Sequence, residues 1–377
     1  MEVKMNQSKY KISFCIVCMN RLHQLKQTLP KNIKEGVDYE NIEYVLLDYN
    51  SGDGLEHWVK DNMADYIQMG KLTYYKTTDP MTWNPSHSKN IAFKLATGDI
   101  ICNLWADYYI GKTFVQYLDM LFTDNADIVL TPIDFHKTKT DHHPPGDVLG
   151  KVCVKKADFT KVRGFDERMN KHGFEDYDFI NRLEMIGIKR VLLDDINFMQ
   201  YIPHQNSERY NLSSHDLKHL YINYQTPFLS EILLLYNDQS FAKGFFIDNI
   251  SKNADNYIYA YHSRNERFDY DLQEPGWETG DWAQQDNSSI LLLNKSNNQN
   301  YIFRHSDDKQ WILEGDNHAV FYQHTDEIII NDVLTFKHFV DTRSIMNENL
   351  NNNKSVVNQD YGQATVYKNF SPTPIII

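Results

Sequence analysis

The sequence predicts an α/β first part, built on an open and mostly parallel sheet, and a mainly β second part. From Lys11 to Phe135, nearly continuous apolar runs alternate with segments of helical spacing. Such alternation is typical of buried strands that are covered by helices on both faces. From about Asn253 onward, short strand-like segments are separated by Asn, Asp, Gly and Ser. Their spacing of roughly 8–12 residues is typical of antiparallel sandwiches and barrels.

Strands and helices are expected to alternate along the first part. The run ISFCIVC predicts a strand buried on both faces, and the apolar residues of SHSKNIAFKLATG recur at helical spacing. The expected strands are 11–19, 43–50, 71–77, 99–107 and 126–135, and the expected helices are 22–33, 54–67, 86–98 and 112–122. Ligands of open α/β sheets bind beyond the carboxyl ends of the strands. We therefore expect residues 19–21, 48–50 and 105–107 to lie along one edge of the sheet.

A third pattern separates the two parts. Residues 212–237, LSSHDLKHLYINYQTPFLSEILLLYN, have helical spacing and are expected to close the first domain. Strand-like pieces follow, among them EIIIND at 327–332 and LTFKHFVD at 334–341, whereas ENLNNN at 348–353 predicts a polar loop. We therefore expect one domain over residues 1–237 and a β-rich accessory domain over residues 238–377.

The composition argues against several kinds of partner. The net charge is −13 and there is no basic block, so we do not expect nucleic acid as a partner. No apolar run approaches the roughly 18–20 residues that span a bilayer. The N-terminus MEVKMNQSKYK lacks the apolar core of a signal peptide, so we expect a cytoplasmic protein without a transmembrane segment. The sequence gives no indication of the oligomeric state.

The cysteines are expected to be reduced and buried. Cys15 and Cys18 form a CxxC pattern, but this pattern lies inside the strand-like run ISFCIVC. A redox or zinc role is therefore not favoured. The other two cysteines, Cys102 and Cys153, are distant in the sequence.

Four stretches contain residues suited to chemistry. They are CMNR at the end of the first strand, YVLLDYNSGDG, NPSHSKNIAFKLATGDIICNLWAD, and VRGFDERMNKHGFEDYDFINRLEMIG, which is followed by IPHQ. Their order resembles the inverting family 2 glycosyltransferases of the GT-A fold, including the chondroitin-polymerase type and the β-1,4-galactosyltransferases. The resemblance covers roughly residues 11–210. Two departures are Phe174, between Gly173 and Glu175, and Trp105, where the family has the first acid of Asp-x-Asp.

The resemblance implies a divalent cation, Mn²⁺ or Mg²⁺. Transfer from a nucleotide sugar leaves a diphosphate that gains negative charge, and a cation with oxygen ligands offsets that charge. By resemblance Asp107 binds the metal and His204 completes the site. The alternatives are a strand-end cap for Asp107 and an exposed loop position for His204.

An acidic cluster opens the helix expected after residue 173. Glu175, Asp176 and Asp178 fall in its first turn, where acids also stabilise a helix through its dipole. By resemblance Asp176 is the general base and Glu175 holds the acceptor sugar, while Asp178 is expected to cap the helix. The turn at 164–167, Gly-Phe-Asp-Glu, is expected to position this loop.

The remaining site residues are assigned by their place in the family pattern. Trp83, on the loop before the third expected helix, is assigned to the acceptor sugar. The residues assigned to the nucleotide sugar are Asn20, Arg21, Asp48, Tyr49, Lys89, Asn90 and Trp105. Packing roles remain open for Tyr49 and Trp83, and a solvated position remains open for Lys89.

We therefore predict inverting, single-displacement transfer of a sugar from a nucleotide-sugar donor, expected to be UDP-linked, to a saccharide acceptor. One alternative is a non-catalytic member of the fold that binds saccharide or a partner. Trp105 favours this alternative, whereas Asp176 and His204 oppose it. A second alternative, a nucleotidyltransferase, needs a glycine-rich basic loop after the first strand, and CMNRLHQLKQ has no glycine.

The aromatic residues of the second part have two interpretations. They either form the core of a small β domain or present a sugar-binding face. The residues concerned are Tyr257, Tyr259, Tyr261, Trp277, Trp282 and Trp311.

Overall fold

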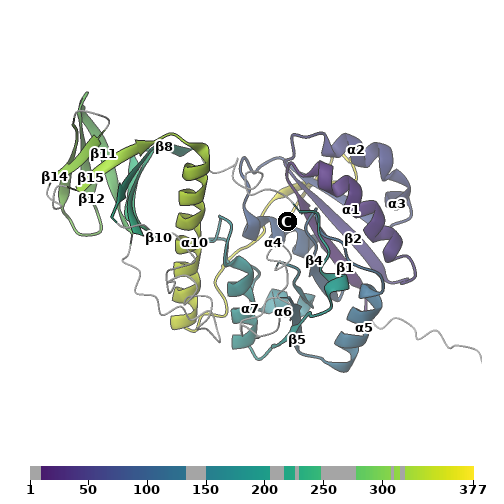
Figure 1. The fold of residues 1–377 in the computed structure, drawn as a ribbon. Helices are drawn as coiled ribbons and strands as arrows, with labels where there is room; N and C mark the ends of the chain where they lie inside the picture. The colour runs from purple at the N-terminus through teal and green to yellow at the C-terminus, as the bar shows by residue number, and fades with distance from the viewer. Residues whose placement is uncertain are drawn as a thin grey trace, which may run out of the picture. The chain divides into compact units, whose positions relative to one another are not determined.

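The fold is taken from a computed structural model (Figure 1). It describes residues 10–132, 150–203, 216–225, 229–247, 277–306, 310–314 and 319–377. These residues belong to two compact units, and each is considered by itself. The first unit comprises described residues of Met1–His204 and Asp341–Ile377, and the second comprises described residues of Gln205–Val340.

The first unit is built on one mixed sheet. Its strand order is β17-β16-β3-β2-β1-β4-β6-β5-β7. The strands are β1 Ile12–Cys18, β2 Ile42–Tyr49, β3 Leu72–Thr77, β4 Ile100–Asn103, β5 Ile128–Thr131, β6 Cys153–Lys155, β7 Lys189–Leu192, β16 Thr365–Lys368 and β17 Pro374–Ile376. The central strands β3, β2, β1 and β4 are parallel, whereas β6 and β16 pair antiparallel on either side of them. The predicted α/β sheet is confirmed, with its parallel part at the centre.

Helices cover both faces of this sheet (Figure 1). They are α1 Leu22–Glu35, α2 Leu55–Asn62, α3 Ala64–Gln68, α4 Pro85–Leu95, α5 Phe114–Asp124, α6 Lys156–Lys161 and α7 Glu175–Met185. Ile12, Phe14 and Ile16 of β1 pack in one core with apolar residues of α1, α2 and α5. Because helices cover both faces, β1 and β2 are buried along their whole length, which explains their nearly continuous apolar sequence.

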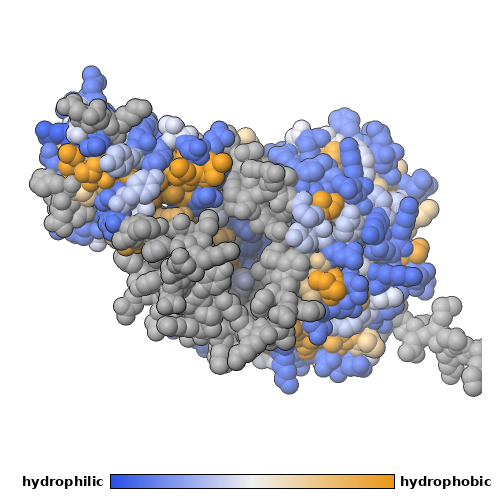
Figure 2. Space-filling model, in the orientation of Figure 1, coloured by the Kyte–Doolittle hydropathy of each residue, from blue (hydrophilic) through white to orange (hydrophobic). Residues whose placement is uncertain are grey.

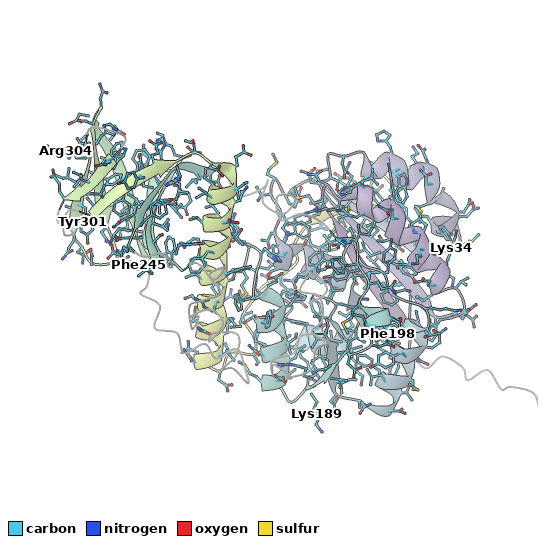
Figure 3. All side chains as sticks on the ribbon, viewed as in Figure 1. Lys34, Lys189, Phe198, Phe245, Tyr301 and Arg304 are labelled. Carbon is cyan, nitrogen blue, oxygen red and sulfur yellow. The ribbon has the colours of Figure 1, made fainter. Side chains whose placement is uncertain are left out.

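Side chains fill the space between the sheet and the helices (Figure 3). Phe198, labelled there, lies with its ring centroid 5.0 Å from that of Phe114 and 5.4 Å from that of Tyr117. All four cysteines are buried and free, as expected.

The helix α4 has clear signals at both ends. Asn84 caps it, since its side chain accepts a hydrogen bond from His87 N at 3.0 Å, and Pro85 occupies the first helical position. The helix ends at Leu95, three residues before the predicted end. Gly98 lies beyond the helix, and a Cβ there would lie within 3.0 Å of Ser13 Oγ. The glycine therefore permits the close approach that starts β4.

The second unit is a closed antiparallel barrel with the strand order β10-β11-β12-β13-β14-β15-β8-β9. The strands are β8 Leu217–Tyr224, β9 Leu229–Tyr236, β10 Ser240–Ile247, β11 Glu278–Asp286, β12 Ser289–Asn294, β13 Asn300–His305, β14 Gln310–Glu314 and β15 Ala319–His324. The predicted mainly β character of the second part is thereby confirmed.

Aromatic residues form much of the barrel core. Trp282 and Trp311 are buried there with Tyr301 and Phe303, so the core interpretation holds for these two tryptophans. Trp277 is partly buried against a second cluster. The three tyrosines at 257, 259 and 261 lie outside the described residues.

The predicted helix over 212–237 is wrong, because β8 and β9 occupy this stretch. Tyr221 and Leu233 belong to the barrel core, whereas their neighbours Ile222 and Leu234 pack in the cluster that includes residues of a helix. Both faces of these strands are thus buried, so the alternation that marks a strand is hidden in the sequence. The second unit accordingly takes in residues that we had assigned to the first domain.

The strands expected at 327–332 and 334–341 are also wrong. One helix, α10 Glu327–Asn351, contains both segments and most of the expected polar loop. Val333 and Leu334 of this helix pack against apolar residues of β8 and β9. Burial of this apolar face outweighs the β-propensity of the isoleucines. The boundary between the two units falls within α10.

The last residues of the chain belong to the first unit and not to the β-rich domain. Strand β16 pairs with β3, and Asn369 N donates to Tyr74 O at 2.8 Å. Val366 is fully buried, and the Phe370 ring stacks on the Tyr74 ring at 4.9 Å. A chain cut at residue 237 would therefore lose two strands of the first unit.

On the side seen in Figure 2, the described residues are mainly hydrophilic, with small separate hydrophobic patches. In the part of the chain that the structure describes, we find no helix with the length and apolar character needed to cross a membrane.

We predict that a chain ending at Asn351 loses more than about 3 kcal/mol of the unfolding free energy of the first unit. A fully buried valine alone contributes about 1.5–3 kcal/mol, and the paired strand adds its hydrogen bonds. Urea unfolding followed by tryptophan fluorescence measures the loss. A chain ending at Phe370 is the control, because it keeps β16 and loses only the exposed β17. Equal stability of the full chain and the chain ending at Asn351 would contradict this account.

Candidate active site

The turns after β1 and β2 lie side by side, as expected for neighbouring parallel strands. Asn20 links them, because its Oδ1 accepts from Gly52 N at 2.7 Å and its N donates to Ser51 Oγ at 3.1 Å. Asn20 has a left-handed backbone with φ of 57°, which asparagine tolerates better than most residues. Arg21 follows at the start of α1 and is half-buried.

Asp48 is used inside the protein. Its carboxylate is fully buried and accepts from Ser51 N at 2.8 Å and from the Tyr74 hydroxyl at 2.7 Å. Burial raises the pKa of Asp48, although these hydrogen bonds oppose the rise. These bonds hold the turn after β2, and the predicted contact of Asp48 with a nucleobase stays a prediction.

A cluster of aromatic rings lies beyond Asp48. The Trp83 ring is 5.8 Å from that of Tyr49 and 5.6 Å from that of Trp105. Tyr49 is only 1% exposed, and its hydroxyl lies 2.8 Å from His87 Nδ1. Trp83 and Trp105 are half-buried, so these two rings, and not that of Tyr49, are accessible to a ligand.

His87 was not anticipated by the sequence. Its Nε2 lies 3.0 Å from the backbone carbonyl oxygen of Gln363. A carbonyl oxygen can only accept a hydrogen bond. In the neutral ring Nε2 therefore carries the proton, and Nδ1 accepts from the Tyr49 hydroxyl. Its ring thus joins the aromatic cluster to the C-terminal segment.

The predicted acids meet a buried lysine. Helix α7 begins at Glu175, after Phe174 in a left-handed conformation with φ of 59°. Lys89 Nζ, on α4, lies 2.6 Å from Asp176 Oδ1 and 3.2 Å from Glu175 Oε1. The side chain of Lys89 is 0% exposed, that of Glu175 is 3% exposed and that of Asp176 is 13% exposed. Lys89 was predicted at the nucleotide sugar, whereas the structure places its ammonium between the two carboxylates.

The electrostatics of this group separate the two acids. Burial raises the pKa of Asp176 to about 6, against the opposing effect of Lys89, and the nearby charge of Glu175 adds to the rise. Burial also acts to raise the pKa of Glu175, but Lys89 and His172 bring it below its usual value. Burial favours neutral Lys89, yet the two acids raise its pKa overall. At neutral pH all three groups are therefore mainly ionised, and Asp176 is the carboxylate closest to accepting a proton.

Gly150 borders the second oxygen of Asp176. A Cβ at this position would lie within 3.0 Å of Trp105 Nε1 and 3.1 Å from Asp176 Oδ2. The Gly150 carbonyl accepts from Asn103 Nδ2 at 2.7 Å, which fixes it against the end of β4. Only glycine fits here without displacing Trp105, and no local sequence pattern indicates this constraint.

Asn90 clamps the turn that precedes the acids. Its Oδ1 accepts from Phe165 N at 2.8 Å, and its Nδ2 donates to Phe165 O and Glu167 Oε1, each at 2.9 Å. Gly164 has φ of 74°, and a Cβ on it would lie within 3.0 Å of Asn90 Oδ1. The side chain of Asn90 is fully buried and forms this clamp, while its predicted nucleotide contact stays a prediction.

The C-terminal segment reinforces the same turn. Asn358 Nδ2 donates to Phe165 O at 2.7 Å, and Gly362 N donates to Glu167 Oε1 at 2.7 Å. The sequence contains no motif that predicts these contacts, because they join residues almost 200 positions apart.

Asp178, which we expected to cap the helix, is buried and forms an ion pair. Its Oδ2 accepts from Arg182 Nε at 2.7 Å, and its Oδ1 accepts from Asn349 Nδ2 at 2.8 Å. Both charged side chains are almost fully buried. Removing one partner of a buried pair costs about 3–5 kcal/mol, well above the 0.3–1 kcal/mol typical of a charge near a helix end.

Asp107 lies in a turn after β4 and is half-buried. Its carbonyl accepts from Ile202 N at 2.9 Å, so residues 201–203 run beside this turn. His204 lies outside the described residues. Within the described ranges there is no group of three or more His, Cys, Asp or Glu suited to a metal ion. The described residues therefore contain one of the two predicted metal ligands.

A family is matched by part of the chain. Residues 13–187 match the sequence model of the family described as "Glycosyl transferase family 2". This range includes Lys89, Trp105, Asp107 and Asp176. The predicted resemblance to family 2 glycosyltransferases is confirmed for these residues, which make up less than half of the chain. No curated protein matches the sequence significantly.

Solved structures show distant similarity. TarS of S. aureus is 16% identical with a TM-score of 0.40, and the match covers 49% of this chain and 58% of that one. The mannosyltransferase PcManGT from Pyrobaculum calidifontis, in complex with GDP-Man and Mn²⁺, is 17% identical with a TM-score of 0.42, covering 53% and 60%. A mutant of Drosophila β-1,4-galactosyltransferase 7, in complex with manganese, UDP-Gal and xylobiose, is 16% identical with a TM-score of 0.36, covering 54% and 75%. The chain spans less than two thirds of TarS and of PcManGT.

Proposed function

We propose that the first unit transfers a sugar from a nucleotide-linked donor, taken to be UDP-linked, to a hydroxyl group of a saccharide, with inversion at the anomeric carbon. The environment of Asp176 carries this proposal. Its carboxylate is mostly buried and has a pKa raised to about 6. Gly150 lies next to both Asp176 Oδ2 and the accessible ring of Trp105. The family match of residues 13–187 supports the reaction class.

The proposed reaction is a single displacement. The acceptor oxygen forms a bond to the anomeric carbon while the bond from that carbon to the diphosphate oxygen breaks. The acceptor proton passes to Asp176, and the electron pair of the broken bond leaves with the diphosphate. A base must be ionised at working pH and yet basic enough to take this proton, which a pKa near 6 allows.

The substrate contacts are assigned to the residues that a ligand can reach. We assign the sugar to the faces of Trp83 and Trp105, and the diphosphate to Arg21 and the adjoining Asn20. Aromatic faces suit sugars because sugar C–H groups pack on them while the hydroxyls remain free to form hydrogen bonds. Glu175 has one oxygen on Lys89 and the other on Gly173 N at 2.9 Å, so it meets the acceptor only if this loop moves.

We assign a divalent cation, Mn²⁺ or Mg²⁺, to Asp107 and His204. This assignment follows the family resemblance of residues 13–187, and of the two residues Asp107 is the one that the structure describes. A bound cation supplies charge that offsets the leaving diphosphate. Trp105 stands where the family has a second acid, so the protein contributes less negative charge to the cation than an Asp-x-Asp pair does.

The second candidate is a non-catalytic member of the fold that binds a saccharide or a partner. Trp105 in the place of the acid favours it. The buried Asp176 opposes it, because its pKa is raised to about 6. A protein that only binds a ligand does not need a carboxyl group whose pKa lies close to neutral pH. Transfer activity that depends on Asp176 decides between the two candidates.

We predict that Asp176→Asn reduces transfer at least about a hundredfold while UDP binding is retained, because general-base assistance is worth about 10²–10⁴ in rate. The kcat/KM of the unaltered protein should fall as the pH drops below about 6, since Asp176 becomes protonated there. The charged groups acting on the pKa of Asp176 are Lys89 and Glu175, and Asp176 in turn raises the pKa of Tyr177. Release of UDP from a panel of UDP-sugars, with saccharide acceptors, measures both effects.

A matched control lies on the same helix. Glu184 of α7 forms an ion pair with Arg190 at 2.7 Å, away from Lys89. Glu184→Gln should therefore leave the rate and its pH dependence unchanged. Turnover of Asp176→Asn within a few-fold of normal would refute the assignment of the base.

Asp107→Asn should abolish the tightening of UDP binding by Mn²⁺, because the amide has no charge to hold the cation. UDP affinity without metal should remain within about twofold of normal. Calorimetric titration of UDP with and without Mn²⁺ measures this, and Asp195→Asn serves as a control because Asp195 only caps a short turn. If the Asp107→Asn protein retained the normal metal effect, Asp107 would not be a ligand.

A further inference from the structure

The side chain of Lys89 is fully buried, whereas a lysine that binds a diphosphate has to be reached by that ligand. Its side chain is 0% exposed, and its Nζ lies 4.4 Å from the centre of the Phe165 ring and 5.2 Å from that of Trp105. A buried ammonium is costly unless charged partners surround it. Here those partners are Asp176 and Glu175, and both belong to the base's own helix turn.

The contact with Asp176 distinguishes its two oxygens. Oδ1 lies 2.6 Å from Lys89 Nζ, which is a short charge-assisted hydrogen bond. Oδ2 is the oxygen that borders Gly150, 3.1 Å from the place where a Cβ on that residue would lie, and the side chain of Asp176 is 13% exposed. Because Oδ1 is engaged, the carboxylate cannot rotate freely to present either oxygen.

We propose that Lys89 is a positioning residue for the base, which anchors Oδ1 of Asp176 so that Oδ2 takes the proton from the acceptor hydroxyl. This proposal rests on the proposed glycosyl transfer. In the step, the acceptor O–H bond breaks and its proton binds Oδ2, while the acceptor oxygen bonds to the anomeric carbon and the diphosphate leaves. Lys89 keeps its own protons throughout and does not touch the donor.

The charges of the group explain why two acids share one lysine. Before the reaction, one ammonium faces two carboxylates, so the group carries a net charge of −1. After Asp176 has taken the proton, Lys89 and Glu175 remain as a neutral pair. Neither state leaves the buried ammonium without a partner, so Glu175 keeps Lys89 in place when Asp176 becomes neutral.

The test compares Lys89→Met and Lys89→Arg by the pH dependence of kcat/KM and by UDP affinity. Lys89→Met leaves two adjacent carboxylates without a counter-ion, so they will retain a proton to higher pH. We expect the acid limb of the pH profile to move up by at least about one pH unit, which by itself lowers the ionised fraction of Asp176 at neutral pH about twofold. Loss of the anchor on Oδ1 misplaces the base as well, so the total fall in kcat should reach about tenfold or more. Lys89→Arg should keep the limb within about half a unit, because the charge remains. The UDP Kd should stay within about twofold for both variants.

Two further variants keep the outcome clear. Lys161→Met removes one charge from an exposed side chain of the same unit and should leave the pH profile unchanged. If Lys89→Met does not fold, the double variant Lys89→Met/Glu175→Gln removes the repulsion. In the double variant, the pH at which kcat/KM falls on the acid side should move back toward that of the unaltered protein. Its kcat should stay low, because Oδ1 of Asp176 has lost its anchor.

The proposal is overturned if the acid limb does not move in Lys89→Met, or if either Lys89 variant weakens UDP binding more than about tenfold, which is the mark of a donor contact. A normal kcat in the double variant would also overturn it. These results differ from failure of the proposed function, which would appear as an Asp176→Asn protein that turns over normally.

Discussion

One buried ion group, Lys89 with Glu175 and Asp176, constrains the rest of the candidate site. A fully enclosed ammonium needs both carboxylates within hydrogen-bond distance, and the distances of 2.6 and 3.2 Å satisfy this need. Pairing of Lys89 on α4 with the first two residues of α7 fixes where α7 begins relative to α4. It also accounts for the left-handed Phe174, because the chain has to turn sharply before the helix to present two successive acids to one lysine.

Polar clamps then hold the backbone around that group. Asn90, one residue after Lys89, fixes the turn before the acids, and Asn358 binds the same turn from the C-terminal segment. Asn349 binds Asp166 and Asp178 at 2.9 and 2.8 Å. Because buried amides and carboxylates are costly when unpaired, these clamps make the position of the acids depend on residues far along the chain.

The sequence predicts the elements whose signals are local, and it fails where tertiary contacts decide. The strands β1 to β4 and the edge carrying residues 20, 48 and 107 follow from apolar runs and strand ends. The helical prediction for 212–237 failed because β8 and β9 are buried on both faces, which removes their alternation. Likewise, the sequence around Asp178 is typical of acids at a helix end. No residue near it in the sequence indicates its hydrogen bond with Asn349. The pairing of Lys89 depends on three-dimensional packing that no spacing rule encodes.

The proposed coupling of Lys89 to Asp176 is measured most directly by a double-mutant cycle. In the cycle, kcat/KM is determined for Lys89→Met, Asp176→Asn and the combined variant at one pH. Residues that act through one another give strongly non-additive losses. If Lys89 acts only through Asp176, the combined variant should be no more than about twofold slower than Asp176→Asn alone. A combined loss equal to the product of the two single losses would contradict the account, because Lys89 would then act on the reaction independently of the base.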